Sequence, residues 1–156
     1  MAPWNPWDAL RSRNCIVMAV RPLPPGVRGA YQARGDRRAI VLSPTLGPAE
    51  RTATLAHELV HDERGGGASY RGQPPTWEPV VARDERQVND EVARRLVPRN
   101  ELERLWRRCR DVEGSLGVAE VAAAFDVPPE VAARALALQR GSGRPRRRSR
   151  SGRSGR

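Results

Sequence analysis

The protein has only two histidines, and they lie four residues apart at positions 57 and 61, with Glu58 between them. The surrounding run AERTATLAHELVHDER (49–64) contains no glycine or proline, follows Gly47-Pro48 and ends at three glycines. These are start and stop signals of a helix. On a helix, residues four apart share one face about 6 Å from each other. The sequence therefore predicts a helix here, and the spacing of the histidines places both imidazoles on the same side of it.

Two imidazole nitrogens on one helix face can hold a single Zn²⁺ at about 2.0–2.1 Å each. Glu58, beside that ion, can accept a proton from water that the metal activates, which is the logic of the H-E-x-x-H pattern. The alternative is a surface helix with two unrelated histidines. The apolar flanks argue against it, because buried imidazoles without a ligand leave ring nitrogens unsatisfied. These flanks are Leu55, Ala56, Leu59 and Val60.

A catalytic zinc takes three protein ligands and keeps one position open for water. The sequence has no third histidine, so the HExxHxxGxxH arrangement is excluded and the remaining ligand must be a carboxylate or, with less support, a cysteine. A second helix is expected over residues 80–97. At about 100° per residue, Glu85 falls within its apolar stripe, whereas Asp84 and Glu91 fall outside it.

We therefore predict that Glu85 is the third metal ligand. Asn89 lies one turn further along and still faces inward, which suits a residue that orients a ligand. The alternative for Glu85 is a buried ion pair with one of the many arginines.

The remaining patterns predict an α+β fold with a small N-terminal sheet of about three strands. Residues 30–33 and 39–42 flank a Gly-Asp turn and are expected to form a hairpin. A capping-box pattern, Asn100 followed by Glu103, predicts the start of a third helix. The other expected elements are a helix over 7–13, a strand over 15–20 and a helix–turn–helix pair over 118–138.

Charge divides the chain into a body and a tail. All 28 basic residues are arginine, against 18 acidic residues, and seven of the arginines lie in residues 141–156, which contain no acid. Residues 1–140 thus carry a net charge of only +3. We expect one domain over 1–140 and a disordered tail over 141–156. The tail can contact nucleic acid nonspecifically, but the charge of the body does not indicate nucleic-acid binding.

The sequence also argues against several classes of protein. No apolar run approaches the roughly 20 residues of a transmembrane helix, so no membrane partner is expected. The N-terminal segment lacks the apolar stretch of a signal peptide, which predicts a cytoplasmic protein. The two cysteines fit no metal or redox spacing.

Three segments together resemble the ImmA/IrrE family of metallo-endopeptidases. They are TLAHELVH (54–61), ERQVN (85–89) and ARRLVP (93–98). Members of that family carry a HExxH helix and then a helix of the form E-x-x-A-N-x-F-A-x-x-L-L-M-P, and the upstream GAYQARGDRRAIVLSP is also similar. The likeness covers roughly residues 4–140. Val88, Glu91 and Val97 stand where Ala, Phe and Met are usual, which affects local packing rather than the ligands.

The resemblance implies a zincin-like helical core in which His57, His61 and Glu85 bind zinc and Glu58 is the catalytic general base. Family members are regulatory proteases, commonly encoded by mobile elements or prophages, that cleave or antagonise helix-turn-helix repressors. A repressor is therefore the implied protein substrate. We expect the substrate to add as a strand at residues 39–42. Tyr70, or an arginine near the second helix, is the candidate donor to the oxyanion.

Two alternatives remain open. The helix–turn–helix pair followed by a basic tail suggests a DNA-binding transcriptional regulator. Its second helix consists mainly of Ala, Val and Leu, with few polar side chains for base edges, so we favour a pair that packs on the core. The other alternative is a pseudoprotease that binds zinc without turnover, and the complete His-Glu-His-Glu set argues against it.

Overall fold

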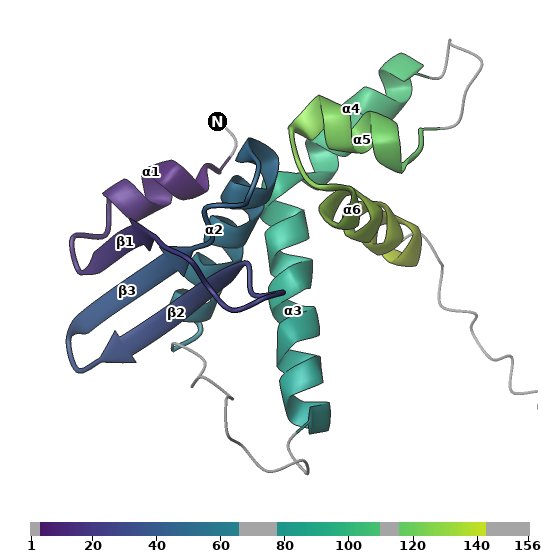
Figure 1. Cartoon of the computed structure of the whole chain (residues 1–156). Coiled ribbons are helices and arrows are strands. Elements are labelled where there is room, and N and C mark those ends of the chain that lie inside the picture. The colour runs from purple at the N-terminus through teal and green to yellow at the C-terminus, as the bar shows by residue number, and fades with distance from the viewer. Residues whose placement is uncertain (1–3, 66–77, 110–115, 143–156) are drawn as a thin grey trace, which may run out of the picture.

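A computed structural model gives the structure of residues 4–65, 78–109 and 116–142 (Figure 1). Within these ranges the chain forms one three-stranded sheet and six helices. The expected α+β class and the small N-terminal sheet are confirmed. None of the helices that the structure describes has the length and apolar character needed to cross a membrane.

The N-terminal third consists of α1 (Pro6–Arg11), β1 (Ile16–Val20), β2 (Gly29–Arg34) and β3 (Arg37–Leu42). Helix α1 starts where it does because the Asn5 side chain accepts a hydrogen bond from the Trp7 backbone N–H. The Trp7 indole also donates to Thr52 Oγ1 at 3.1 Å. This bond ties the first helix of the chain to the long helix that follows the sheet.

The strand order in the sheet is β1-β3-β2. Strands β2 and β3 form the predicted antiparallel hairpin, which turns at Gly35 with a positive φ of 57°. Strand β1 pairs with β3 in parallel, so β3 is central. The prediction that residues 39–42 form the edge for the substrate is therefore wrong. Apolar patterning identifies a strand but not its neighbours, and the parallel pairing depends on a connection that local sequence does not reveal.

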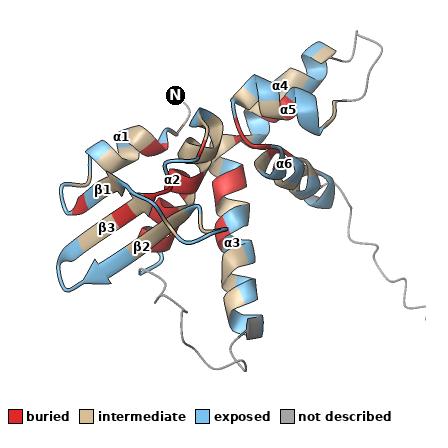
Figure 2. Cartoon of the chain, in the orientation of Figure 1, coloured by how far each residue is buried: buried red, intermediate tan, exposed pale blue. Residues whose placement is uncertain are grey.

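Helices α2 (Pro48–Glu63) and α3 (Glu78–Leu96) correspond to the two helices predicted to carry the site. Helix α2 is the centre of the fold. Its residues Leu55 and Leu59 pack on the sheet, in a cluster with Ile40 and Leu42. Its adjacent face, with Ala56 and Val60, packs on Val88 and Val92 of α3. Figure 2 shows how strongly burial concentrates on α2. The helix is thus packed against both the sheet and α3.

The C-terminal part contains α4 (Arg99–Cys109), α5 (Val118–Phe125) and α6 (Pro129–Ser142). Asn100 does not cap α4 as predicted, because the helix already starts at Arg99, and the Pro98 carbonyl accepts the Leu102 N–H at 3.0 Å. The expected helix–turn–helix pair is present, with Asp126 in the left-handed conformation between its helices. Helix α6 extends past residue 141, and the rest of the predicted tail lies outside the described residues.

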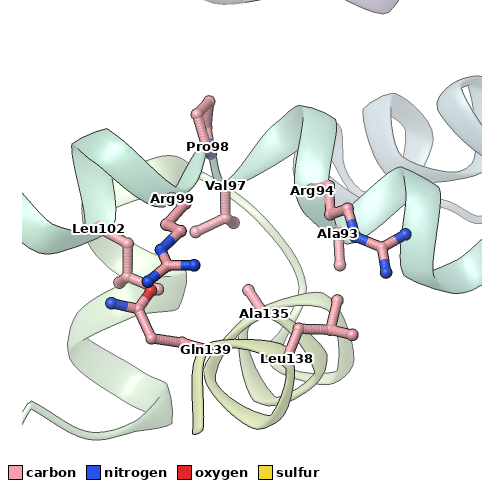
Figure 3. Close-up of a pocket in the computed structure, with 9 residues that line it drawn as sticks. All are labelled: Ala93, Arg94, Val97, Pro98, Arg99, Leu102, Ala135, Leu138 and Gln139. Atoms are coloured by element: carbon pink, nitrogen blue, oxygen red, sulfur yellow. The ribbon is translucent and has the colours of Figure 1, made fainter. Parts of the chain in front are cut away.

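Helix α6 packs against α3 and the α3–α4 junction. Ala132 and Ala135 are buried in one cluster with Ala93 and Val97. Beside this cluster lies a cavity of about 320 Å³, into which Val97 and Leu102 point from one side and Ala135 and Leu138 from α6 (Figure 3). The C-terminal helix pair is therefore part of the same packed structure as the helix that carries the candidate site.

Candidate metal centre

His57, His61 and Glu85 point to a common centre between α2 and α3. The Nε2 atoms of the two histidines are 3.1 Å apart. Glu85 Oε2 lies 3.3 Å from His57 Nε2, and Glu85 Oε1 lies 3.1 Å from His61 Nε2. The structure thus brings together the three side chains that the sequence singles out as ligands. No other group of three such donors occurs in residues 4–65, 78–109 and 116–142.

Helix packing explains this convergence. The two histidines share a face of α2 because they are separated by four residues. Val88 and Val92 of α3 pack against α2, and Glu85 lies three residues before Val88 on the same face. His61 is buried, whereas His57 and Glu85 are partly exposed. The centre therefore lies at the side of the helix interface and remains accessible from outside.

The geometry fits a tetrahedral zinc ion. Ligands at about 2.0–2.1 Å from such an ion are separated from one another by about 3.3 Å. The two Nε2 atoms are 3.1 Å apart, and each lies 3.1–3.3 Å from a different oxygen of Glu85. Two imidazoles and one carboxylate are also the donor types of catalytic zinc sites. With one Glu85 oxygen as ligand, the set leaves a fourth position for water or substrate. The residues present therefore fit the predicted metal.

Asn89 lies one turn beyond Glu85, and its Oδ1 is 3.2 Å from Nδ1 of His57. A carbonyl oxygen can only accept, so in this contact Nδ1 carries the proton and donates. In neutral His57 the lone pair then resides on Nε2, which faces Glu85 and His61. The contact agrees with the orienting role predicted for Asn89.

Electrostatics within the cluster follow from these contacts. When the imidazoles are protonated, the hydrogen bonds from His57 and then His61 hold the pKa of Glu85 well below its usual range, so this carboxylate is ionised. Burial lowers the pKa of His57, but Glu85, Glu58 and Asn89 outweigh that effect and raise it overall. Negative charge and ring nitrogens thus converge on one point, where a cation is stabilised.

Glu58 is buried beside this centre, with 7% of its surface exposed. Burial raises the pKa of its carboxyl group, and the two histidines oppose this shift. Its carboxylate forms no hydrogen bond with any residue of the described ranges. Glu58 lines an open cleft, so its carboxylate is available to a proton or a bound molecule.

Gly29, the first residue of β2, allows the sheet to approach this carboxylate. A Cβ atom at position 29 would lie 2.5 Å from Cγ2 of Thr54 and 2.8 Å from Oε1 of Glu58. Real Cβ contacts are essentially never this short, so any larger residue here would force Thr54 or Glu58 to shift. Sequence reasoning did not assign Gly29 a role, although a glycine within a strand pattern is itself a signal of close approach.

Asp62, which follows His61 directly, was also missed. It is 7% exposed, and its carboxylate accepts from the Tyr31 hydroxyl at 2.8 Å and from Arg13 and Arg38 at 3.0 Å each. Because these donors come from β2, from the α1–β1 connection and from β3, one carboxylate fixes the last turn of α2 to the sheet. Local sequence gives no signal for such distant partners.

Tyr70, the candidate oxyanion donor, lies outside the described residues. Its role therefore remains a prediction.

A comparison with protein-family models agrees with the geometry. The model described as the IrrE N-terminal-like domain, a peptidase family designated Peptidase_M78, matches residues 16–137. This chain belongs to that family. The matched range begins at the first residue of β1 and ends within α6, so this IrrE-like metallopeptidase domain includes every described side chain of the centre. No curated protein matches the chain.

Proposed function

We propose that this IrrE-like protein is a zinc-dependent endopeptidase with Glu58 as its general base. The observation that carries the proposal is the convergence of His57, His61 and Glu85 at 3.1–3.3 Å beside the buried residue Glu58, whose carboxylate accepts no hydrogen bond from the described residues. In the proposal these three side chains hold Zn²⁺. When bound, zinc supplies Lewis acidity that makes water a nucleophile near neutral pH and polarises the scissile carbonyl.

Glu58 performs the proton transfers in this proposal. It lies on the same helix as both histidines and carries no competing hydrogen bond among the described residues. It accepts the proton of the attacking water and delivers it to the leaving amine. Asn89 acts on His57 as a positioning residue, because it holds the ring with Nε2 toward the centre.

Strand β2 offers the edge on which a substrate peptide can lie. The Ser43 N–H donates to the Arg28 carbonyl at 2.8 Å, so the backbone of Arg28 faces β3. Successive residues alternate along a strand, and the backbone groups of Gly29 and Tyr31 therefore turn to the open side of β2. A substrate added there as a strand passes directly beside Glu58, which replaces the edge expected at residues 39–42.

The substrate class proposed from the family resemblance is a helix-turn-helix repressor, with the protease acting as a regulator encoded on a prophage or a similar mobile element. DNA binding by the C-terminal helix pair has no support from the structure. One face of α6 is occupied by packing on α3. The exposed residues of the helix are Pro129, Glu130, Ala133, Ala137, Arg140 and Gly141. Such a surface offers little to base edges.

Cleavage of a co-expressed repressor tests the proposal. Glu58→Gln should retain zinc and lower the rate of cleavage on the order of 10²–10⁴-fold. Glu103→Gln, a matched change on the distant helix α4, should leave the rate unchanged. Normal cleavage by Glu58→Gln would show that the assigned base is wrong. Zinc-loaded parent protein that cleaves neither repressors nor other peptides would be a pseudoprotease, and the proposal would fail.

A further inference from the structure

The cleft beside Glu58 has a wall that comes from the C-terminal helix. This cleft has a volume of about 420 Å³. Helix α2 contributes His57 and Glu58, α3 contributes Val92, the β1–β2 connection contributes Val27, and α6 contributes Val131. Figure 1 shows that connection extending from the sheet toward α3, with α6 lying beside α3. Segments far apart in the sequence thus surround the space next to the candidate catalytic group.

This wall is aliphatic. Val27, Val92 and Val131 come from three different elements and line the same space. Val92 is buried, whereas Val27 and Val131 are only partly buried and keep surface available to a bound molecule. Apolar side chains that meet next to a reactive group form the usual lining of a binding pocket.

The charges at the rim of the cleft are already paired with each other. Of its described lining residues only Arg28, Glu58 and Glu130 carry a formal charge. Arg28 donates a hydrogen bond to Glu130, and its Nη2 lies 3.6 Å from Glu50 Oε1. The bond to Glu130 raises the pKa of Arg28 and lowers that of Glu130, so both remain ionised. Because Arg28 and Glu130 are paired with each other, neither is free to pair with a charged substrate side chain in the cleft.

We propose that this cleft receives an aliphatic side chain of the substrate, next to the scissile bond, and that Val131 and Val27 set this preference. The inference rests on the proposed endopeptidase function. A peptide strand on the open edge of β2 turns alternate side chains toward α2 and the cleft. An aliphatic side chain gains by leaving water there, whereas an acidic one loses its hydration and meets the carboxyl group of Glu58 in the same lining.

The proposal gives the C-terminal helix pair a role in specificity. Helix α6 is held at the cleft by two contacts on either side of Val131. Glu130 binds Arg28 of the β1–β2 connection, and Arg134 binds Asp90 of α3. These ion pairs add to the apolar packing of Ala132 and Ala135 on α3, which places Val131 relative to Glu58. A charge introduced at position 131 should consequently act on substrate choice and leave the metal ligands in place.

A peptide library made from a digested cell extract tests the proposal. The zinc-loaded full-length protein is incubated with the library, and mass spectrometry of the new termini gives the residue preference at each position. We expect Val, Leu or Ile to dominate one position beside the cleaved bond. Val131→Asp should shift the ratio of aliphatic to basic residues at that position about tenfold or more toward Lys and Arg. Val118→Asp, at an exposed position of α5, should leave the profile unchanged.

If Val131→Asp does not fold, the same cleavage profile is measured with Val27→Asp. The proposal is overturned if the parent shows no aliphatic preference at any position, or if folded Val131→Asp and Val27→Asp variants give the parent profile.

A peptide-binding experiment distinguishes a failure of the proposed pocket from a failure of the proposed endopeptidase function. Zinc-loaded Glu58→Gln protein is immobilised, and the library peptides that it retains are identified. If the parent cleaves nothing, the endopeptidase proposal falls. Retention enriched in aliphatic peptides, and lost when Val131→Asp is added, would still support the pocket, whereas retention without that enrichment would overturn it.

Discussion

Helix α2 carries two buried carboxylates one turn apart, and their surroundings are opposite. Glu58 and Asp62 are each 7% exposed. Asp62 accepts hydrogen bonds from Tyr31, Arg13 and Arg38. Glu58 accepts none from the described residues and instead lies beside two histidines and the close-approaching Gly29. Equal burial therefore does not mean equal function.

The difference shows that buried carboxylates in one helix can have structural or chemical roles, depending on their hydrogen-bond donors. A buried carboxylate with a full set of donors stabilises the protein, and the donors of Asp62 fix α2 to the sheet. A buried carboxylate without donors costs stability, and that cost is accepted where the group acts in chemistry. In the proposed mechanism, Asp62 anchors the helix on which Glu58 transfers protons.

Removing Asp62 should have the largest effect on folding. Asp62→Ala loses three hydrogen bonds to a charged acceptor, and we expect the free energy of unfolding to fall by about 3 kcal/mol. Glu58→Gln, the matched change one turn away, should leave that free energy unchanged or raise it by up to about 1 kcal/mol. Urea denaturation of both variants measures the contrast. Equal losses in the two variants would remove the distinction between the carboxylates.

Gly29→Ala should disturb the environment of Glu58 directly. The new Cβ would lie 2.5 Å from Thr54 Cγ2 and 2.8 Å from Glu58 Oε1, so side chains or backbone must shift, at a cost of about 2 kcal/mol. We expect lower peptidase activity while zinc binding is kept. Gly141→Ala is the control, because nothing lies within 4 Å of a Cβ there. Full activity and stability in Gly29→Ala would show that the close approach has no role.

Asn89→Ala should weaken the metal centre without unfolding it. Loss of the contact to His57 Nδ1 frees the ring and its tautomer, for which we expect about a tenfold lower zinc affinity. Competition with a chelator measures this affinity. Gln87→Ala, on the same helix, is the matched control. Unchanged affinity in Asn89→Ala would show that Asn89 does not position the ligand.

The smallest expected effect concerns Tyr31 and its bond to Asp62. Burial, and then Asp62, raise the pKa of Tyr31 to about 12. Because the folded protein holds this proton more tightly than the unfolded chain, the associated stability is complete below about pH 10 and is lost as the pH rises toward 12. Ultraviolet titration in a Tyr70→Phe background isolates Tyr31. Asp62→Asn should lower this pKa, and an unchanged value would contradict the anchoring bond.

Local patterns were sufficient to predict most of the fold and the side chains that meet at the centre. Helix limits such as Gly47-Pro48 and apolar periodicity are encoded within a few residues, and the spacing of His57 and His61 defines a shared face. The apolar stripe of α3 likewise placed Glu85 toward α2. These predictions rest on geometry within single elements.

Features that depend on distant partners were not predictable. The parallel pairing of β1 with β3 made residues 39–42 central instead of an edge. The donors of Asp62 come from segments 24 to 49 residues away, and Glu130 meets Arg28 across 102 residues. Such contacts arise only when the layers pack, so a single sequence does not contain a local signal for them.

Zinc titration followed by calorimetry tests the central claim, that two imidazoles and Glu85 hold one ion. We expect one zinc per chain in the parent, in Glu58→Gln and in the control Glu91→Ala on the same helix as Glu85. His61→Ala and Glu85→Ala should lose stoichiometric binding while remaining folded. A parent protein that binds no zinc, or a Glu85→Ala variant that binds it as tightly as the parent, would contradict the account.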